Sequence, residues 1–221
     1  MIQFIKDQNF INGANELANL LNSKLSHGPV LWIVSGGSNI LIEKYILDQI
    51  ENKNLANLEV ILGDERFVSS KDPNSNYLQL ISIGFKNKRL NFEPILRNQN
   101  LEDTKKYYLN QLLNKLNKNP VIIGQFGIGA DGHTLGILPF STAISSKDKV
   151  LYIEGKDFMR LSLSLDFIKK SINYGYLFCF GKDKQKILQI LKSGNGSQLK
   201  YPSLIFRQIK SIKLYNEYIG G

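Results

Sequence analysis

Cysteine and histidine are scarce in this sequence. Cys179 is the only cysteine among 221 residues, and the histidines are His27 and His133. A single thiol cannot form an internal disulfide, and its place within the apolar stretch YLFCF predicts a buried strand. Two distant histidines without a cysteine cluster give no metal-ligand spacing. We therefore expect neither an internal disulfide nor a bound metal ion.

Long apolar runs are absent as well. No run approaches the ~20 residues that a membrane-spanning helix needs. The first residues, MIQFIKDQNFINGANE, lack the basic segment, apolar run and small-residue cleavage site of a secretory signal. No repeat, low-complexity tract or Pro/Gly/Ser-rich linker divides the chain. The sequence therefore predicts a cytoplasmic protein that makes no membrane contact and forms one domain over residues 1–221.

Negative charge is under-represented, with 19 Asp+Glu against 28 Lys+Arg and a formal net charge of +9. A clustered basic face would favour nucleic acid, whereas a few convergent cations would suit a phosphorylated metabolite. The densest groups, KNKR at 86–89 and KK at 105–106 and 169–170, are scattered. None is interleaved with aromatic residues as in an RNA-binding strand. We expect solvated helix faces and no nucleic-acid partner; the oligomeric state stays open.

Short apolar runs alternate with amphipathic segments along the chain. Helices are predicted over 11–24, 39–51, 102–117 and 183–193. Strands are predicted within the run PVLWIVSGGS at 29–38, which also holds an exit loop, and at 58–63, 120–129, 150–155, 160–165, 176–181 and 211–215. The pattern predicts an α/β fold, with a single doubly wound, mostly parallel, Rossmann-like sheet and helices on both faces.

Polar loops follow three of these strands. They are Ser35-Gly36-Gly37-Ser38, Asp64-Glu65-Arg66 and the segment 129–134. In a doubly wound fold, ligands bind beyond the carboxyl ends of the strands. The sequence therefore predicts that these loops meet in one site.

The SGGS loop lies between a strand and a helix and is suited to hold an anion. Glycines let the backbone approach a phosphate, and a helix N-terminus presents unpaired N–H groups. A tight strand-to-helix turn also favours glycine and serine, so the motif alone does not decide between the two. It lacks the GK[ST] ending of a Walker loop.

The GDER segment places a carboxylate pair beside an arginine at a strand end. Such a group could perform acid–base chemistry or bind a polar substrate. A structural ion pair in a loop is the alternative. The following DPNSNY, residues 72–77, is rich in turn formers and predicts a loop that leads into a helix.

The segment GQFGIGADGHTLGILP, residues 124–139, matches the letters of a dinucleotide-binding loop at Gly127, Gly129 and Gly132. Glu154 lies where a ribose-binding acid would be expected. However, Pro139 leaves little room for the helix that should hold the pyrophosphate. His133 is two residues from Asp131, which could orient its ring and fix its tautomer. A base that takes a proton from water is the better interpretation.

Taken together, SGGS, GDERFV…DPNSNY and GIGADGHT…LP resemble, in this order and spacing, the 6-phosphogluconolactonases. These share a fold and superfamily with the glucosamine-6-phosphate deaminases. The deaminases carry a glutamate just before the proline, where this chain has Leu138, and tend to have an aromatic residue where it has Arg66. Both differences favour lactone hydrolysis.

The resemblance implies a role for each candidate residue. His133 would activate water, Asp131 would orient His133, and Arg66 would bind substrate or stabilise the developing negative charge. Substrate and its 6-phosphate would be held by the remaining candidates: Gly36, Gly37, Ser38, Asp64, Arg160 and Lys184. The reaction implied is hydrolysis of 6-phosphogluconolactone to 6-phosphogluconate, in the pentose phosphate pathway, without a cofactor or metal.

Two alternatives remain open. One is a deaminase or isomerase acting on glucosamine 6-phosphate, and the other is a sugar-phosphate-binding protein with a decayed active site. The chain also departs from the family pattern: Asn39-Ile40 replace the usual Thr-Pro, and Leu135-Gly136 replace Ala-Ser. These changes leave room for a divergent substrate.

Overall fold

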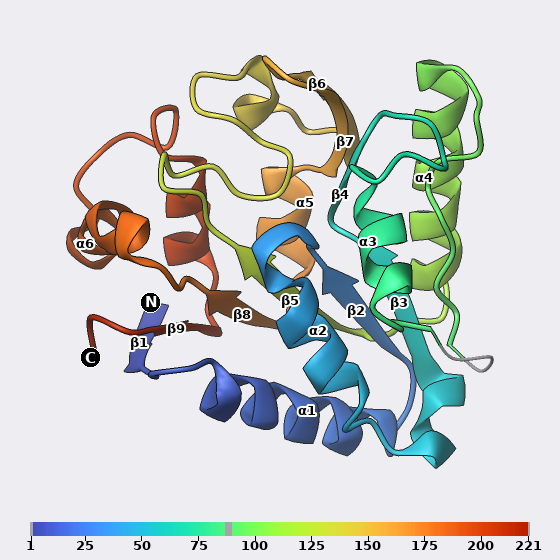
Figure 1. Ribbon diagram of the computed structural model, residues 1–221, viewed down its shortest axis with the longest axis horizontal. Coiled ribbons are helices and arrows are strands. Elements are labelled where there is room, and N and C mark those ends of the chain that lie inside the picture. Colours follow the sequence, from blue (N-terminus) through green and yellow to red (C-terminus); the bar gives the residue numbers. More distant parts are fainter. Residues whose placement is uncertain (1, 87–89, 221) are drawn as a thin grey trace.

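The computed structural model describes residues 2–86 and 90–220 (Figure 1). Its main sheet has six strands in the order β1-β9-β8-β5-β2-β3, and all neighbouring strands are parallel. They are β1 (Ile2–Lys6), β9 (Ile212–Asn216), β8 (Tyr174–Phe178), β5 (Val121–Gly127), β2 (Val30–Val34) and β3 (Leu58–Leu62). The predicted parallel α/β sheet is confirmed. Most of the basic group at 86–89 lies outside the described residues.

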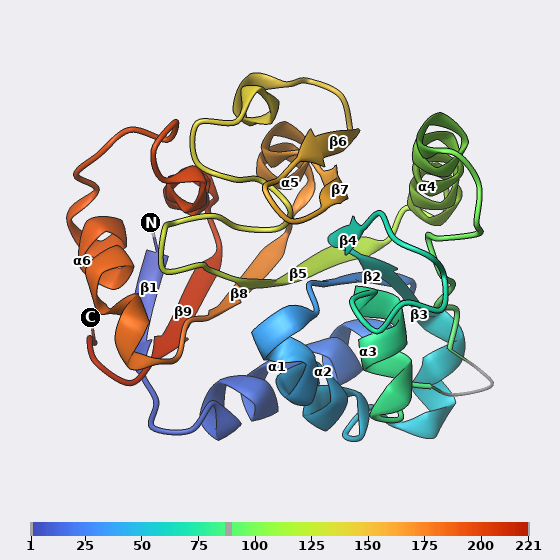
Figure 2. The ribbon, with the colours of Figure 1, turned by 45° about the horizontal axis from the view of Figure 1, so that its top comes forward.

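Helices cover both faces of this sheet (Figures 1 and 2). One face carries α1 (Ile11–Leu25), α2 (Ile40–Leu47) and α3 (Asn76–Ser82), and the other carries α4 (Leu101–Leu116) and α5 (Leu165–Ser171). Helix α6 (Gln185–Ser193) lies beside the edge formed by β9 and β1. Short 3-10 turns connect them: η1 (Gly37–Asn39), η2 (Asn52–Asn57), η3 (Thr142–Ser145), η4 (Lys182–Lys184) and η5 (Pro202–Gln208).

Helix α1 shows why these segments fold as predicted. Its apolar residues recur at helical spacing, and Ala14, Leu17 and Leu21 are fully buried against the core. Helix α2 ends earlier than predicted, at Leu47. The amide of Asn22 donates to the backbone oxygen of Gln49 and accepts from the N–H of Glu51, which draws the chain out of the helix.

A second, three-stranded antiparallel sheet was not predicted from the sequence. It contains β4 (Asp64–Arg66), β7 (Met159–Leu163) and β6 (Val150–Glu154), with β7 in the middle. The predicted loop 64–66 is thus a short strand, in which Arg66 lies opposite Arg160. The pairing fixes the backbone of residues 64–66, which a loop would leave mobile.

The order of the strands creates a switch point. From β2 the chain moves outward to β3, then returns past β2 to add β5 on its other side. Loops leaving the carboxyl ends of β2 and β5 therefore diverge and leave a crevice between them, where doubly wound proteins bind ligands. In the described residues, no helix is long and apolar enough to cross a membrane.

Candidate active site

The three polar loops meet in one cavity at this switch point. It has a volume of about 240 Å³ and is bounded by the exits of β2 and β5 and by β4. The candidate residues that line it are Gly36, Gly37, Ser38, Asp64, Arg66, His133 and Lys184. The predicted convergence of the loops is therefore present in the structure.

His133 and Asp131 form a hydrogen-bonded pair beside the cavity. Nδ1 of His133 lies 2.7 Å from Oδ1 of Asp131, which also accepts the backbone N–H of His133 at 3.1 Å. An ionised carboxylate only accepts hydrogen bonds, so Nδ1 carries the proton and Nε2 keeps a free lone pair. Partial burial acts to raise the pKa of Asp131, but the hydrogen bonds and charge of His133 hold that pKa below its ordinary value.

The glycine loop after β5 is shaped around this pair. A Cβ at Gly129 would lie only 2.1 Å from Nδ1 of His133, so no larger residue fits there without displacing the ring. The N–H of Gly129 donates to the backbone oxygen of His133 at 2.9 Å. The hydroxyl of Thr134 donates to the backbone oxygen of Gly127 at 2.9 Å and closes the loop. The backbone therefore holds His133 in place from both sides.

The SGGS turn forms the opposite wall. Gly36 has φ 79° and ψ −157°, a conformation that is essentially restricted to glycine. Ser35 and Gly36 are buried, whereas Gly37 is half-buried and Ser38 is exposed. All four residues of the turn line the cavity, and its second half is the more exposed.

The residues of the GDER segment have separate roles. Glu65 points away from the cavity and accepts the N–H groups of Asn76 at 2.7 Å and Tyr77 at 3.0 Å, so it anchors the start of α3. Asp64 lines the cavity, and burial raises its pKa to about 7 despite the nearby charge of Arg66. Arg66 donates to the backbone oxygen of Asn74 at 2.8 Å. Glu65 therefore serves the fold, while Asp64 and Arg66 face the site.

Lys184 and Arg160 occupy different surroundings. Lys184 lines the cavity, with Nζ 3.2 Å from Oδ2 of Asp183. Arg160 does not line it: its guanidinium donates to the carboxylate of Asp157 at 2.8 and 3.0 Å. The structure therefore brings Lys184, but not the guanidinium of Arg160, to the cavity wall.

Sequence reasoning missed three side chains that line the cavity, those of Asn76, Ile128 and Leu135. The amide of Asn76 donates to the backbone oxygen of Asp64 at 3.0 Å, while its Oδ1 is buried without a partner among the described residues. Leu135 adopts φ 54°, a strained value for a residue with a side chain. The segment DPNSNY predicted only a turn before a helix, so it gave no sign that Asn76 would reach the site. Leu135-Gly136 differed from the family pattern, but that difference did not predict a side chain in the cavity.

The dinucleotide interpretation is not supported by the geometry. No helix begins within residues 128–141, all of which the structure describes, so the loop lacks the N–H groups that would hold a pyrophosphate. Glu154 lies on β6 and lines a different groove, of about 680 Å³, together with Leu138 and Phe140. Across the described residues, His, Cys, Asp and Glu side chains form no group of three or more that could hold a metal ion.

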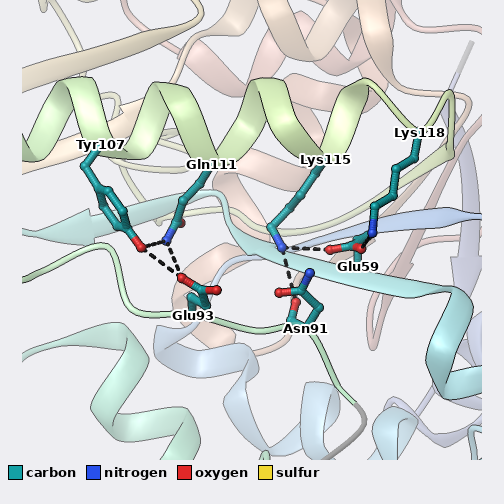
Figure 3. Close-up of polar contacts among 7 residues, drawn as sticks. All are labelled: Glu59, Asn91, Glu93, Tyr107, Gln111, Lys115 and Lys118. Atoms are coloured by element: carbon teal, nitrogen blue, oxygen red, sulfur yellow. Dashed lines mark hydrogen bonds and ion pairs between the residues drawn. The ribbon is translucent and has the colours of Figure 1, made fainter.

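A second polar cluster lies at the other end of β3, between that strand and α4 (Figure 3). We define it as Glu59, Asn91, Glu93, Tyr107, Gln111, Lys115 and Lys118, and call it the Glu59 cluster. Lys115 is 2.9 Å from Glu59 and also donates to the backbone oxygen of Asn91, while Lys118 pairs with the other carboxylate oxygen of Glu59. Tyr107 and Gln111 bond to each other and to Glu93. Both lysines are thus paired with Glu59, whereas Glu93 forms its ion pair with Arg97, outside the cluster, at 3.1 Å.

The fold and the cavity define a class: a doubly wound α/β protein with a glycine turn and a histidine–aspartate pair at its switch point. The sequence from residue 6 to 214 matches the family described as glucosamine-6-phosphate isomerases/6-phosphogluconolactonase. The chain belongs to this family.

Relatives and solved structures agree with that assignment. The chain is 26% identical over 193 residues to the 6-phosphogluconolactonase of Aggregatibacter actinomycetemcomitans, covering 83% of this chain and 82% of the relative. It is 28% identical over 194 residues to that of Haemophilus influenzae, with the same coverage. The crystal structure of 6-phosphogluconolactonase from Leishmania guyanensis superposes with a TM-score of 0.77 at 20% identity, covering 98% of this chain and 96% of that one. The structural likeness supports the fold, and the two sequence relatives share a single named activity.

Proposed function

We propose that the protein hydrolyses 6-phosphogluconolactone to 6-phosphogluconate. The observation that carries this proposal is the placement of His133, with Nε2 free, in the same cavity as the SGGS turn. A base and an anion-binding turn in one small cavity suit a substrate that has a reactive carbonyl at one end and a phosphate at the other. The named activity of the two sequence relatives supports the same choice.

The reaction needs one water molecule and no covalent enzyme intermediate. His133 takes a proton at Nε2 from water, and the oxygen of that water forms a bond to the lactone carbonyl carbon. The ring C–O bond then breaks, and the leaving alkoxide takes the proton back from His133. Asp131 holds Nδ1 and stabilises the imidazolium that forms between these steps. A positioned base of this kind contributes about 10²–10⁴ in rate.

The other candidates bind the substrate. The SGGS turn, through Gly36, Gly37 and Ser38, holds the 6-phosphate together with Lys184. Arg66 contacts the substrate or stabilises the developing oxyanion, and Asp64 binds a sugar hydroxyl from the same wall. Arg160 is proposed to assist phosphate binding, which requires its guanidinium to leave Asp157.

Further expectations from the sequence stay proposals: one domain over residues 1–221, a cytoplasmic location, no cofactor and no nucleic-acid partner. Among the residues that the structure describes, a cluster of buried apolar side chains links the main sheet with the second sheet, which supports the proposal of one domain.

The test is a comparison of substrates with the wild-type protein. Freshly generated 6-phosphogluconolactone is expected to be hydrolysed far above its spontaneous rate, whereas glucosamine 6-phosphate releases no ammonia. Ammonia release without lactone hydrolysis would favour the deaminase alternative. Binding of 6-phosphogluconate without turnover of either substrate would favour a sugar-phosphate-binding protein.

A further inference from the structure

A buried carboxylate lies directly behind the SGGS turn. Glu43 is on α2, its residue is 0% exposed, and its side chain reaches back to the exit of β2. Its Oε1 accepts the backbone N–H of Ser35 at 2.7 Å and that of Gly36 at 3.2 Å. The hydroxyl of Ser35 also donates to Oε1, at 3.4 Å. Glu43 is therefore bound to the first half of the turn.

These contacts divide the turn into two halves. Glu43 takes the N–H groups of Ser35 and Gly36, so these point away from the cavity. Across the part of the chain that the structure describes, the N–H groups of Gly37 and Ser38 donate to no protein acceptor. Both residues line the cavity. The N–H groups of Ser35 and Gly36 are thus bonded within the protein, and those of Gly37 and Ser38 remain for a ligand.

The turn is also supported from the opposite side. A Cβ at Gly36 would lie 2.9 Å from Cγ of Asn76, whose amide is anchored on the backbone of Asp64. Gly36 is therefore fixed between the Glu43 carboxylate and the Asn76 amide. A backbone held in this way loses little conformational entropy when it binds an anion.

Core packing alone does not account for a carboxylate at this position. Glu43 lies in the otherwise apolar run ILIE, and its neighbours Ile42, Ile46 and Leu47 are buried hydrophobic residues. Burying a carboxylate costs free energy that an apolar residue of similar volume would avoid. The hydrogen bonds that offset this cost come from the N–H groups of the SGGS turn, so the carboxylate stabilises the conformation of that turn.

We propose that Glu43 is a positioning residue for phosphate binding. By holding the N–H groups of Ser35 and Gly36, it sets the backbone so that those of Gly37 and Ser38 face the 6-phosphate. The proposal rests on the proposed function, and it assigns Glu43 to the phosphate end of the substrate rather than to the reacting carbonyl.

The test compares Glu43→Met with Glu43→Gln on two lactones. Glu43→Met removes the acceptor and keeps an unbranched side chain, while Glu43→Gln keeps one acceptor oxygen. With 6-phosphogluconolactone, Glu43→Met is expected to raise KM about tenfold, equivalent to about 1.4 kcal/mol, and to leave kcat nearly unchanged. Glu43→Gln should restore most of the lost affinity. With unphosphorylated gluconolactone, kcat/KM should be the same in both variants and the wild type.

Glu59→Gln provides a matched control, because it makes the same chemical change at a buried carboxyl remote from the cavity. It should leave KM for both lactones unchanged. An equal loss on the two lactones in Glu43→Met, or no rescue by glutamine, would overturn the proposal. Either result would mean that Glu43 supports the fold without a specific role at the phosphate.

A measurement on the wild type keeps the test independent of the variants' folding and of catalysis. In amide NMR spectra, 6-phosphogluconate and inorganic phosphate should shift the signals of Gly37 and Ser38 most, and those of Ser35 and Gly36 much less. The reverse pattern, or no shift in the turn, would overturn the proposal. Failure of lactone hydrolysis with this NMR pattern intact would refute the proposed function alone.

Discussion

One strand, β3, connects two polar regions with opposite properties. Near its amino end, Glu59 is buried and bonded to Lys115 and Lys118 (Figure 3). Just beyond its carboxyl end, Asp64 is also buried, but its carboxylate accepts no hydrogen bond from the described residues. Burial acts to raise the pKa of both groups. The two lysines bring the pKa of Glu59 below its ordinary value, whereas the pKa of Asp64 rises to about 7.

This difference separates a structural cluster from a site. In the Glu59 cluster both lysines pair with the carboxylate of Glu59, and Glu93 bonds to Tyr107 and Gln111. At the cavity, Nε2 of His133, the carboxylate of Asp64 and the N–H groups of Gly37 and Ser38 remain available to a substrate. Leu135, which lines the same cavity, has a strained backbone with a positive φ. Among these described residues, the polar groups without a protein partner thus lie in the cavity where the chemistry is proposed, whereas both lysines of the Glu59 cluster have one.

The largest effect is expected from Asp131→Asn, which disturbs the cavity without touching the Glu59 cluster. An amide can donate as well as accept, so it no longer fixes the proton on Nδ1 of His133. We expect kcat for lactone hydrolysis to fall about 10²–10⁴-fold, the contribution of a positioned base. Steady-state kinetics measure this effect. Asp166→Asn, which breaks ion pairs with Lys147 and Lys170, is the control and should leave kcat unchanged. Equal kcat in Asp131→Asn and wild type would contradict the assignment.

Glu59→Leu should do the opposite and lower stability without changing kinetics. It leaves Lys115 buried without its carboxylate partner. We expect a loss of about 3 kcal/mol, the lower end for a broken buried pair, because Lys118 is half exposed and water reaches the cluster. Since 1 kcal/mol corresponds to roughly 2–4 °C in a domain of this size, Tm should fall by roughly 6–12 °C.

The double variant Glu59→Leu/Lys115→Met sharpens that result. It removes the stranded charge together with its partner, so Tm should recover most of the loss. A change in kcat or KM for the lactone in either variant would contradict the view that the Glu59 cluster is structural and independent of the cavity.

A smaller effect is expected from Glu43→Gln in the pH dependence of stability. Burial raises the pKa of Glu43 from 4.5 to about 7, against the hydrogen bonds from Ser35 and Gly36. Its contribution to stability is therefore fully present below pH 4.5 and is lost as the pH rises towards 7. Between pH 5 and 8, the wild type should lose about 2.5 kcal/mol of stability relative to Glu43→Gln, so its Tm should fall by roughly 5–10 °C relative to that of the variant.

Glu59→Gln supplies the comparison for this pH series. Because the pKa of Glu59 is lowered, its contribution is lost only as the pH falls below the ordinary value of 4.5. The difference in Tm between Glu59→Gln and wild type should therefore stay constant between pH 5 and 8. Thermal melts at several pH values measure both differences, and parallel curves for Glu43→Gln and wild type would refute the prediction.

The smallest effect is expected from Asp48→Asn, which removes an exposed ion pair with Lys44 one helical turn away. Such pairs contribute about 0.3–0.5 kcal/mol, so Tm should change by less than about 2 °C. Kinetics on the lactone should match wild type. A larger effect would mean that exposed pairs also matter to the fold, and that the contrast between the two buried regions is incomplete.

The sequence predicted the elements and the meeting of the loops because both depend on local patterns. Helical spacing at Ala14, Leu17 and Leu21 identified α1, and apolar runs ending in glycine or charge identified β2, β3 and β5. The parallel arrangement then brings SGGS, GDER and the His133 loop to one edge. The position of these loops could therefore be predicted without knowledge of any contact between distant residues.

What the sequence did not predict depends on pairing between distant segments. Residues 64–66 form a strand only because they meet β7, and β1 is defined by its pairing with β9. Glu43 lies in an apolar helix, where a single glutamate is typical of a solvated position. Its role depends on the backbone direction of the SGGS turn, which no local pattern specifies. Arg160 matched the family pattern, but the structure bonds it to Asp157.

The most direct test of the account is the rate of 6-phosphogluconolactone hydrolysis by wild type and by His133→Asn, measured above the spontaneous background. Binding of 6-phosphogluconate to both proteins is measured alongside, to show that the cavity is intact. The account predicts a large wild-type acceleration that falls by about 10²–10⁴ in the variant while binding is kept. Equal acceleration in the two proteins would contradict the assignment of His133 as the base, and no acceleration in wild type would contradict the lactonase function itself.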